Sequence, residues 1–202
     1  MNGAARPRLV VATLNLAKGR EVLALLRDAP CEPRLLADLV PGARLPEETG
    51  ETYRDNALLK ARAAATLTGT LALADDSGIE VDALDGAPGV RSARFGGGGL
   101  DDAGRTALLL ERLGGVPVER RTARYRCVIA VVWPHGSERT AEGTAEGVIT
   151  AAPRGGGGFG YDPVFEDPRL GRTFAELTPD AKAAVSHRGR AVRAAAALLG
   201  VP

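Results

Sequence analysis

The stretch that decides the fold class is RLVVATLNLAKGREVLALLR, residues 8–27. Its first part, 8–13, is a short apolar run that ends in a polar Thr-Leu-Asn turn, a pattern typical of a buried strand. Apolar residues then recur at helical spacing over 18–27, so a helix is expected there. A buried strand followed directly by a helix is the repeating unit of α/β folds.

The alternation of strand and helix continues after this stretch. Prolines and glycines in 40–50 predict a loop. Thr52 and Asp55 have the three-residue spacing of a capping box, which marks the start of the next helix. The expected elements are strands at 34–36 and 71–74 and helices over 52–66 and 100–113.

The second half of the chain adds strands before a last helix. The expected elements are strands at 122–133, 138–150 and 164–165, with a hairpin turn at 134–137. Thr178 followed by Pro179 is typical of a helix N-cap and first helical position, so the last helix is expected to start there.

Length and composition indicate a globular protein. The 202 residues are 45% hydrophobic and 25% charged, with a mean hydropathy of −0.05, which is not the composition of a disordered chain. Together with the order of elements, this predicts an α/β fold with a mixed sheet. Residues 1–202 are expected to form a single domain, in which 1–7 are a flexible tail.

Net charge and cysteine usage exclude several classes of protein. A formal charge of +1 argues against coating nucleic acid or an anionic membrane. No apolar run approaches the roughly 20 residues of a membrane span, and residues 1–8 lack the apolar segment of a secretory signal. Cys31 and Cys127 have neither metal-binding nor redox spacing, which favours a reducing cytoplasm.

Candidate phosphate-binding chemistry begins at the turn 13–18, between the first strand and the first helix. Backbone amides and the positive end of a helix suit a phosphate, with Lys18 as counter-charge, although the P-loop pattern is absent. Only three lysines occur beside 23 arginines. Lys18, Lys60 and Lys182 are therefore candidates for positions where a compact point charge is needed and an arginine would not serve. An ordinary strand-to-helix turn is the alternative interpretation of 13–18.

Two acidic clusters supply hard oxygen ligands. Glu47 and Glu48 lie in the loop before the second helix, and Asp75 and Asp76 follow the strand 71–74. Such carboxylates hold Mg²⁺ together with substrate phosphates, and one of a close pair can act as a general base because its neighbour raises its pKa. Each cluster alone is more often a solvated turn than a metal site. Together with a phosphate-binding turn, they predict a metal–phosphate site.

The glycine-rich segment 155–162 formally contains the Gly-x-Gly-x-x-Gly pattern of a dinucleotide-binding turn. Its context excludes that interpretation, because Pro163 and a strand follow it instead of a helix. Phe159 and Tyr161 either present aromatic faces to a base, where stacking is worth about 1–3 kcal/mol, or pack in the core.

Two further groups lie on predicted helices. Asn56 and Lys60 share one helix face at i, i+4, beside the acidic loop. Lys182 and His187 would point about 140° apart on an unbroken helix, so a shared small ligand requires a break near Ser186.

Five segments together resemble the inosine triphosphate pyrophosphatase family, whose members hydrolyse noncanonical purine nucleoside triphosphates. The resemblance covers about residues 9–199, and the motifs stand in the family's order. They are ATLNLAKGRE, EETGETYRDNALLKARAA, ADDSGIEVDALDGAPGVRSAR, GFGYDPVF and FAELTPDAKAAVSHRGRA. Any one string is weak evidence, but five in register are strong evidence.

The resemblance implies an elongated α/β fold of two lobes, with a long central mixed sheet flanked by helices and the active cleft between the lobes. It also implies a homodimer, dependence on Mg²⁺, and cleavage of ITP, dITP or XTP to the monophosphate and pyrophosphate. The expected partners are therefore a purine nucleoside triphosphate and a second copy of the chain. Neither nucleic acid nor a membrane is an expected partner, and the expected location is the cytoplasm.

The resemblance also implies roles in the reaction. Asp76 would be the base that activates water, and Asp76 and Glu47 would hold Mg²⁺. Lys60 would face the phosphates, and Ser77 would contact the substrate. The residues that would cradle the triphosphate are Thr13, Leu14, Asn15, Leu16, Ala17 and Lys18.

The remaining implied roles concern the base. Lys182, His187 and Arg188 would read the base edge, and Phe159 would stack on the base. The wall of the nucleotide site would consist of Phe159, Gly160, Tyr161 and Asp162. Leu14 departs from the pattern, because the family's first motif usually has Gly at that position, and a side chain there would restrict the loop and crowd the phosphates.

Three other interpretations account for parts of the sequence. A pyrophosphatase for pyrimidine or modified nucleotides would not explain the aromatic glycine-rich loop and the segment 182–188. A nucleotide sensor without catalysis would not need the four acidic residues in the two clusters. A nucleic-acid-binding module, raised by the many arginines, is disfavoured by the near-neutral charge.

Overall fold

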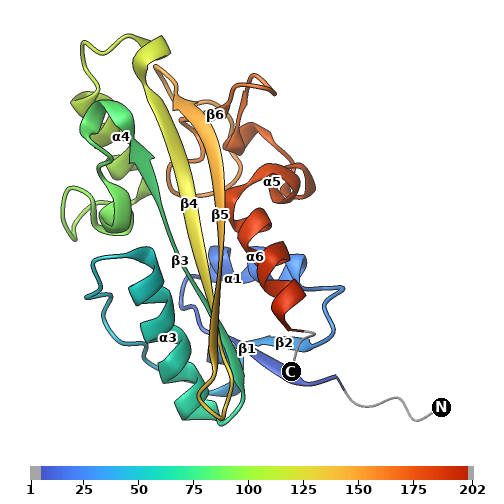
Figure 1. The fold of residues 1–202 in the computed structure, drawn as a ribbon. Helices are drawn as coiled ribbons and strands as arrows, with labels where there is room; N and C mark the ends of the chain where they lie inside the picture. Colours follow the sequence, from blue (N-terminus) through green and yellow to red (C-terminus); the bar gives the residue numbers. More distant parts are fainter. Residues whose placement is uncertain (1–5, 200–202) are drawn as a thin grey trace. The chain divides into compact units, whose positions relative to one another are not determined.

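The structure is a computed structural model that describes residues 6–199. Its strands form one seven-stranded sheet in the order β2-β1-β3-β4-β5-β6-β7 (Figure 1). The chain divides into two compact units. Unit 1 consists of residues 6–76, 127–143 and 188–199, and unit 2 consists of Ser77–Arg126 and Thr144–His187.

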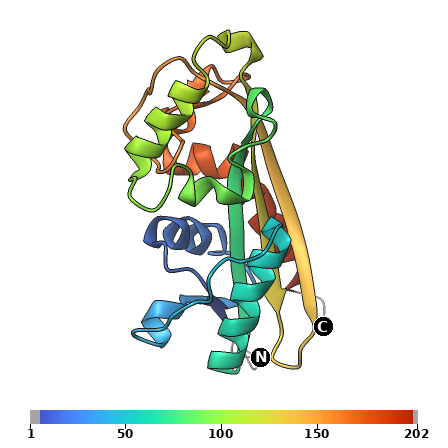
Figure 2. The ribbon, with the colours of Figure 1, turned by 90° about the vertical axis from the view of Figure 1, so that its left-hand side faces the viewer.

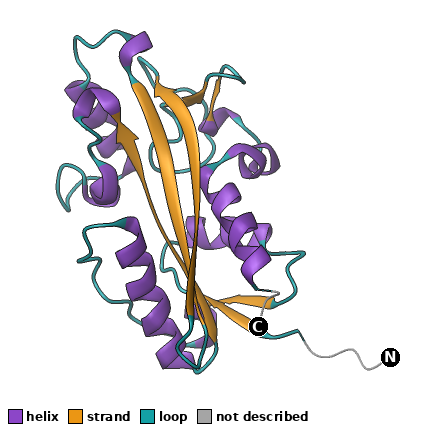
Figure 3. Ribbon diagram, in the orientation of Figure 1, coloured by secondary structure: helices purple, strands orange, loops and turns teal. Residues whose placement is uncertain are grey.

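Helices and strands alternate in the first part of the chain, and longer strands follow (Figure 3). The strands are β1 (Arg8–Val11), β2 (Glu32–Leu35), β3 (Leu71–Val81), β4 (Thr122–Val132), β5 (Glu138–Ile149), β6 (Phe165–Asp167) and β7 (Arg172–Thr173). The α-helices are α1 (Leu16–Leu25), α2 (Leu36–Leu39), α3 (Tyr53–Thr68), α4 (Asp102–Arg112), α5 (Pro179–Val185) and α6 (His187–Leu198). None of the helices described between residues 6 and 199 is long and apolar enough to cross a membrane.

The expected α/β fold with a mixed sheet is confirmed. β1 pairs in parallel with β2 and with β3, whereas β6 pairs antiparallel with β5 and with β7. The single domain over 1–202 stays a prediction. Of the expected tail over 1–7, residues 1–5 lie outside the described part of the chain, and the Pro7 carbonyl accepts a hydrogen bond from the Glu32 amide at 2.9 Å.

In unit 1, the strands have a helix on each face. Figures 1 and 2 show α3 on one face of these strands and α6 on the other. Because side chains alternate across a strand, odd-numbered residues of β1 and β3 pack on the face that α1 and α6 cover. The core on that face includes Leu9, Val11, Val22, Leu26, Leu73, Cys127, Ile129, Val131, Ala191, Val192 and Ala195.

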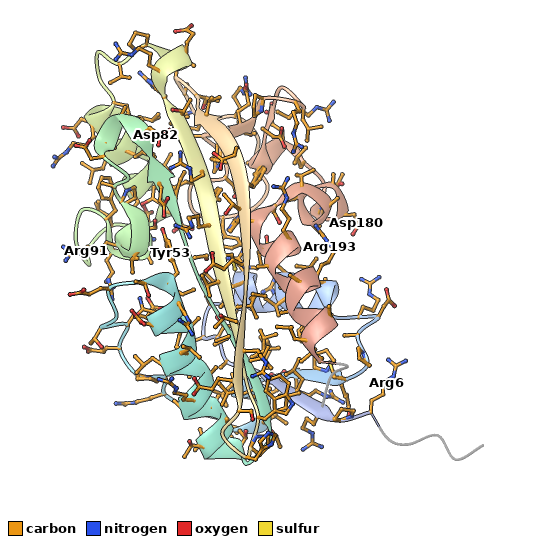
Figure 4. All side chains as sticks on the ribbon, in the orientation of Figure 1. Arg6, Tyr53, Asp82, Arg91, Asp180 and Arg193 are labelled. Atoms are coloured by element: carbon orange, nitrogen blue, oxygen red, sulfur yellow. The ribbon has the colours of Figure 1, made fainter. Side chains whose placement is uncertain are left out.

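Unit 2 has an aromatic core built around Tyr125 of β4. The Tyr125 ring lies 4.6 Å from the Phe165 ring and 5.9 Å from the Phe174 ring, centroid to centroid. At the end of β3, the carboxylate of Asp82 (labelled in Figure 4) accepts hydrogen bonds from Thr122 and Arg124 of β4 at 2.7 and 2.9 Å. Packing and ion pairing together hold the strands of this unit.

The predicted end of the third strand is wrong. β3 does not stop before Asp75 but continues through both aspartates to Val81. Two adjacent carboxylates normally disfavour a strand. Here each one meets cationic or amide groups of the surrounding helices, so the charges are compensated and the strand extends.

The predicted last helix is divided in two. Thr178 caps α5 and Pro179 is its first residue, as expected, but the helix ends at Val185 because Ser186 is extended, with φ −71° and ψ 156°. A second helix, α6, then begins at His187. The segment 83–99 contains the short 3₁₀ turn Gly89–Arg94, and β7 has no counterpart in the expected elements.

Gly147 in β5 provides a test of the packing in unit 2. A Cβ at this position would lie 2.5 Å from the Phe165 ring and 2.6 Å from the Glu166 carbonyl oxygen. We expect Gly147→Ala to lower the free energy of unfolding by about 1–3 kcal/mol because the strands must separate to accept it. Gly156→Ala is the matched control, since no atom lies within 4 Å of its added Cβ. Urea unfolding of both variants makes the comparison, and equal midpoints would contradict the described packing.

Candidate functional site

The turn 13–18 is organised by Asn15, the N-cap of α1. The Asn15 Oδ1 accepts hydrogen bonds from the amides of Ala17 and Lys18, each at 3.0 Å. Its own amide donates to the Thr13 hydroxyl at 3.2 Å. Two of the exposed donors at this helix end are therefore used inside the turn.

Two other backbone donors of the turn are not used inside it. Within residues 6–199, the amides of Leu14 and Leu16 have no hydrogen-bond partner, and both side chains are more than half exposed, at 51% and 58%. Leu14 also does not have a positive φ, because Asp85 is the only described residue other than glycine that does. The leucine in place of the family's glycine is therefore accommodated without backbone strain.

Asp75 is a buried carboxylate that binds two cations in unit 1. Its Oδ2 lies 3.4 Å from Lys18 Nζ and 3.3 Å from both Nε and a terminal nitrogen of Arg188. Arg188 is only 2% exposed and also donates to Glu21 at 2.5 Å. Burial by itself would raise the pKa of Asp75, but the charges of Lys18 and Arg188 outweigh it and hold that pKa well below its usual range.

Asp76 has a different environment, on the α3 side of the strand. Asn56 Nδ2 donates to its Oδ2 at 3.1 Å, and Lys60 Nζ lies 3.7 Å from its Oδ1. Burial raises the pKa of Asp76; Lys60 opposes this shift, while the negative charge of Glu48 adds to it. The expected common face of Asn56 and Lys60 is confirmed, and both side chains meet the same carboxylate.

The two aspartates are not the close pair that the sequence analysis expected. Successive side chains of a strand point to opposite faces, so Asp75 turns toward α1 and α6 while Asp76 turns toward α3. The like-charged neighbour that raises the pKa of Asp76 is Glu48. A pair of adjacent acids in one strand therefore yields two carboxylates with opposite pKa shifts.

The acidic loop before α3 places its two glutamates differently. Glu48 accepts a hydrogen bond from Lys60 Nζ at 2.5 Å, whereas Glu47, the predicted metal ligand, is exposed. Gly50 holds this loop on α3, because its amide donates to Asn56 Oδ1 at 2.8 Å. Among residues 6–199, no group of three or more acidic, histidine or cysteine side chains is gathered tightly enough to hold a metal by itself.

In unit 2, Asp162 organises the glycine-rich segment. Its Oδ2 accepts hydrogen bonds from the Phe159 amide at 2.9 Å and from Lys182 Nζ at 2.5 Å. Lys182 Nζ also lies 4.7 Å from the centroid of the Phe159 ring, a cation–π distance. Lys182 and Asp162 are both buried, so their charges compensate each other inside the protein.

The other residues of this segment are anchored by more distant parts of unit 2. The Tyr161 hydroxyl donates to the Ser92 carbonyl at 2.8 Å, and Tyr161 is 4% exposed. The Gly160 amide donates to Asp102 Oδ2 at 2.7 Å, and its carbonyl accepts from the Thr106 hydroxyl at 3.3 Å. Tyr161 is therefore a packed residue, while Phe159 remains partly exposed.

The residues at the break between α5 and α6 are buried. The His187 ring stacks on Tyr125, with 4.4 Å between ring centroids and 8° between ring planes. Arg188 contacts Asp75 and Glu21, as described above, and its role at the base edge stays a prediction. Ser77, directly after Asp76 in β3, is partly buried. The helix break required for Lys182 and His187 to share a ligand is present at Ser186.

The structure adds residues that sequence reasoning did not select. Each of the three lysines meets a carboxylate, and these partners, Asp75, Glu48 and Asp162, all lie in the quoted motifs. Glu21 is the last residue of the first motif, but no spacing rule connects it to Arg188 across the chain. The contact of Asp102 with Gly160 likewise has no signal in the sequence, because the two residues meet only in the folded chain.

Known proteins of one family match this chain over nearly its whole length. The model of the Ham1 family matches residues 9–198. The chain is 52% identical over 193 residues to a dITP/XTP pyrophosphatase from Desulforamulus reducens, covering 95% of both chains. It is 53% identical over 185 residues to a protein of the same name from Symbiobacterium thermophilum, covering 92% of this chain and 91% of the relative.

Solved structures give the same result. A HAM1 protein from Coxiella burnetii aligns with a TM-score of 0.86 at 40% identity, covering 97% of this chain and 100% of the other. A nucleoside-triphosphatase / dITP/XTP pyrophosphatase from Mycobacterium abscessus aligns with a TM-score of 0.74 at 47% identity, covering 95% and 98%. The resemblance inferred from the five motifs is confirmed, and this chain belongs to the Ham1 family.

Proposed function

We propose that this protein hydrolyses noncanonical purine nucleoside triphosphates (ITP, dITP and XTP) to the nucleoside monophosphate and pyrophosphate, and so cleanses the nucleotide pool. The observation that carries the proposal is that the two adjacent aspartates of β3 have opposite pKa shifts. Asp75 is a permanently charged anchor for cations, whereas Asp76 is a carboxylate of raised pKa. The name dITP/XTP pyrophosphatase, borne by relatives about half identical to this chain, supports the choice of substrate.

Asp76 is suited to act as the general base. Its raised pKa makes it a better proton acceptor than an ordinary surface aspartate. In the proposed step, the oxygen of water bonds to the α-phosphorus in line with the leaving group, and Asp76 takes the proton. The bond from the α-phosphorus to the bridging oxygen then breaks, and pyrophosphate leaves.

Cations and amides of unit 1 are proposed to bind the triphosphate. Lys18 is fixed by Asp75 and Lys60 by Glu48 and Asp76, so each ammonium is held in place before the substrate arrives. The amides of Leu14 and Leu16, at the N-terminal end of α1, provide two more donors for phosphate oxygens. Preorganised positive charge of this kind stabilises the developing charge of the leaving pyrophosphate.

A divalent metal fits the acidic side chains next to this region. Asp76 and Glu48 both approach Lys60 Nζ, at 3.7 and 2.5 Å, and Glu47 lies exposed in the same loop. Mg²⁺ usually takes only one or two protein carboxylates together with waters and substrate phosphates, so this set is sufficient. We propose that Asp76 holds Mg²⁺ with a glutamate of the loop, either Glu47, as the family resemblance implies, or Glu48. When bound, the metal would neutralise phosphate charge and polarise the scissile bond.

Side chains of unit 2 are proposed to recognise the base. The partly exposed ring of Phe159 offers a stacking surface. Lys182 is a buried donor next to that ring, suited to the 6-oxo group of hypoxanthine and xanthine. Adenine carries an amino donor at this position, which cannot accept a hydrogen bond from the lysine, so adenine would lose the contact that the 6-oxo group makes. His187 of this unit and Arg188 of unit 1 are proposed to take part in reading the base edge.

We further propose a homodimer that acts in the cytoplasm. Cys31 and Cys127 are both buried free thiols, which supports a reducing compartment. Burial raises the pKa of the Cys127 thiol to about 12, so it stays protonated and unreactive. The homodimer rests on the family resemblance, and its test is the molar mass in solution by light scattering.

Product analysis tests the reaction itself. The purified protein is incubated separately with dITP, XTP, dATP and dGTP, first with Mg²⁺ and then with a chelator. We expect monophosphate and pyrophosphate from dITP and XTP, and no turnover with the chelator. Diphosphate and orthophosphate would show that a different bond breaks, and tight binding of dITP without turnover would favour a nucleotide sensor.

Replacing the proposed base gives a sharper test. We expect Asp76→Asn to lower kcat for dITP by about 10²- to 10⁴-fold, because the amide cannot accept the proton from water. The exposed Asp38→Asn of α2 is the matched control and should keep the wild-type rate. Thermal unfolding checks that both variants are folded, and a near-normal rate for folded Asp76→Asn would exclude Asp76 as the base.

Base selectivity tests the role of Lys182. We expect Lys182→Ala to lower the ratio of kcat/KM for dITP to that for dATP by about tenfold or more, because the donor for the 6-oxo group is lost. Lys182→Arg keeps the charge but changes its shape, and should restore the ratio only in part. An unchanged ratio in folded Lys182→Ala would refute the base-reading role.

A further inference from the structure

Helix α4 contacts both backbone polar groups of one residue of the glycine-rich segment, Gly160. Asp102, the first residue of α4, accepts the Gly160 amide at 2.7 Å. Thr106, one turn later on the same helix face, donates its hydroxyl to the Gly160 carbonyl at 3.3 Å. Thr106 is 4% exposed, so its contact lies inside unit 2. This pair of contacts is called the α4 clamp below.

The backbone conformation of Gly160 sets the direction of the chain in this segment. It has a φ of +61°, a conformation that glycine adopts at little cost, and it separates Phe159 from Tyr161. Tyr161 is already fixed through its hydroxyl to Ser92. The orientation of Phe159 relative to that fixed point therefore depends on the two dihedral angles of Gly160, which the α4 clamp holds.

Asp102 is equipped to make a strong contact. Arg105, three residues later, donates to its other carboxylate oxygen at 2.6 Å. Burial would raise the pKa of Asp102, but the hydrogen bonds from Arg105 and from the Gly160 amide outweigh it, so that the pKa is lowered. A hydrogen bond to an ionised acceptor is about twice as strong as one between neutral groups.

From this geometry we infer that Asp102, together with Thr106, is a positioning residue for the Phe159 ring and thereby sets the binding of the purine base. The inference rests on the proposed function, because Phe159 is the proposed stacking surface. Asp102 is not among the residues proposed to bind the phosphates. Its loss affects how tightly the base is held and how well bases are distinguished, while the chemical step is preserved.

Asp101 provides a matched control next in the sequence. It is the N-cap of α4, and its side chain accepts the Gly104 amide at 2.8 Å, so it stabilises the helix without any described contact to the glycine-rich segment. If Asp102 served only the helix, the two variants would behave alike.

The test compares steady-state kinetics with dITP and dATP for wild type, Asp102→Ala, Asp102→Asn and Asp101→Ala. We expect Asp102→Ala to raise KM for dITP by about tenfold, with kcat changed less than about twofold, because a charge-assisted hydrogen bond is lost. Asp102→Asn retains an acceptor oxygen and should recover most of that loss. Asp101→Ala should lower the unfolding temperature but leave KM unchanged. Equal KM values for Asp102→Ala and Asp101→Ala would overturn the inference.

Two further measurements separate the possible failures. If Asp102→Ala does not fold, Thr106→Val removes the other half of the α4 clamp, and a KM unchanged from wild type would then overturn the inference. Amide exchange at Gly160, followed by NMR in wild type and Asp102→Ala, reports on the clamp without any substrate. Faster amide exchange at Gly160 in the variant would support the α4 clamp, whatever the substrate. Absence of dITP turnover by the wild type would refute the proposed function but not the clamp.

Discussion

The alternation of side chains along β3 is the constraint on which the rest of this protein depends. Because adjacent residues of a strand face opposite sides of the sheet, Asp75 and Asp76 enter two different environments from one dipeptide. Asp75 meets Lys18 and Arg188, and Asp76 meets Asn56 and Lys60. A shift of one residue in the strand would exchange these environments and leave buried charges unpaired.

The electrostatics of unit 1 follow from that arrangement. A buried carboxylate is tolerated only when its charge is compensated, and Asp75 achieves this with two cations that lie far apart in the sequence. The compensation also fixes Lys18 at the start of α1, beside the exposed amides of the turn. Asp76 receives weaker compensation, so that burial prevails and its pKa rises. One ion pair network thus supplies both an anchored cation and a carboxylate suited to proton transfer.

In unit 2, the main structural requirement is to hold the glycine-rich segment in one conformation. Such a segment has many accessible conformations when it is free, and ordering it has an entropic cost. Separate anchors offset that cost: Ser92 for Tyr161, α4 for Gly160, and Lys182 for Asp162. The result is a partly exposed aromatic ring, Phe159, on a fixed backbone.

Much of this could be predicted from the sequence, and the limits have a common cause. Periodicity and capping rules located most helices and strands, since these depend on neighbours within a few residues, and the motifs identified the family. The sequence also indicated the chemistry of Lys18, Lys60, Asp76 and Lys182 through residue type and motif. Only the tertiary structure decided that β3 continues through two aspartates and that Glu48 is the charged neighbour of Asp76. It alone decided that Asp102 holds Gly160, because charge compensation depends on which distant groups the fold brings within a few ångströms.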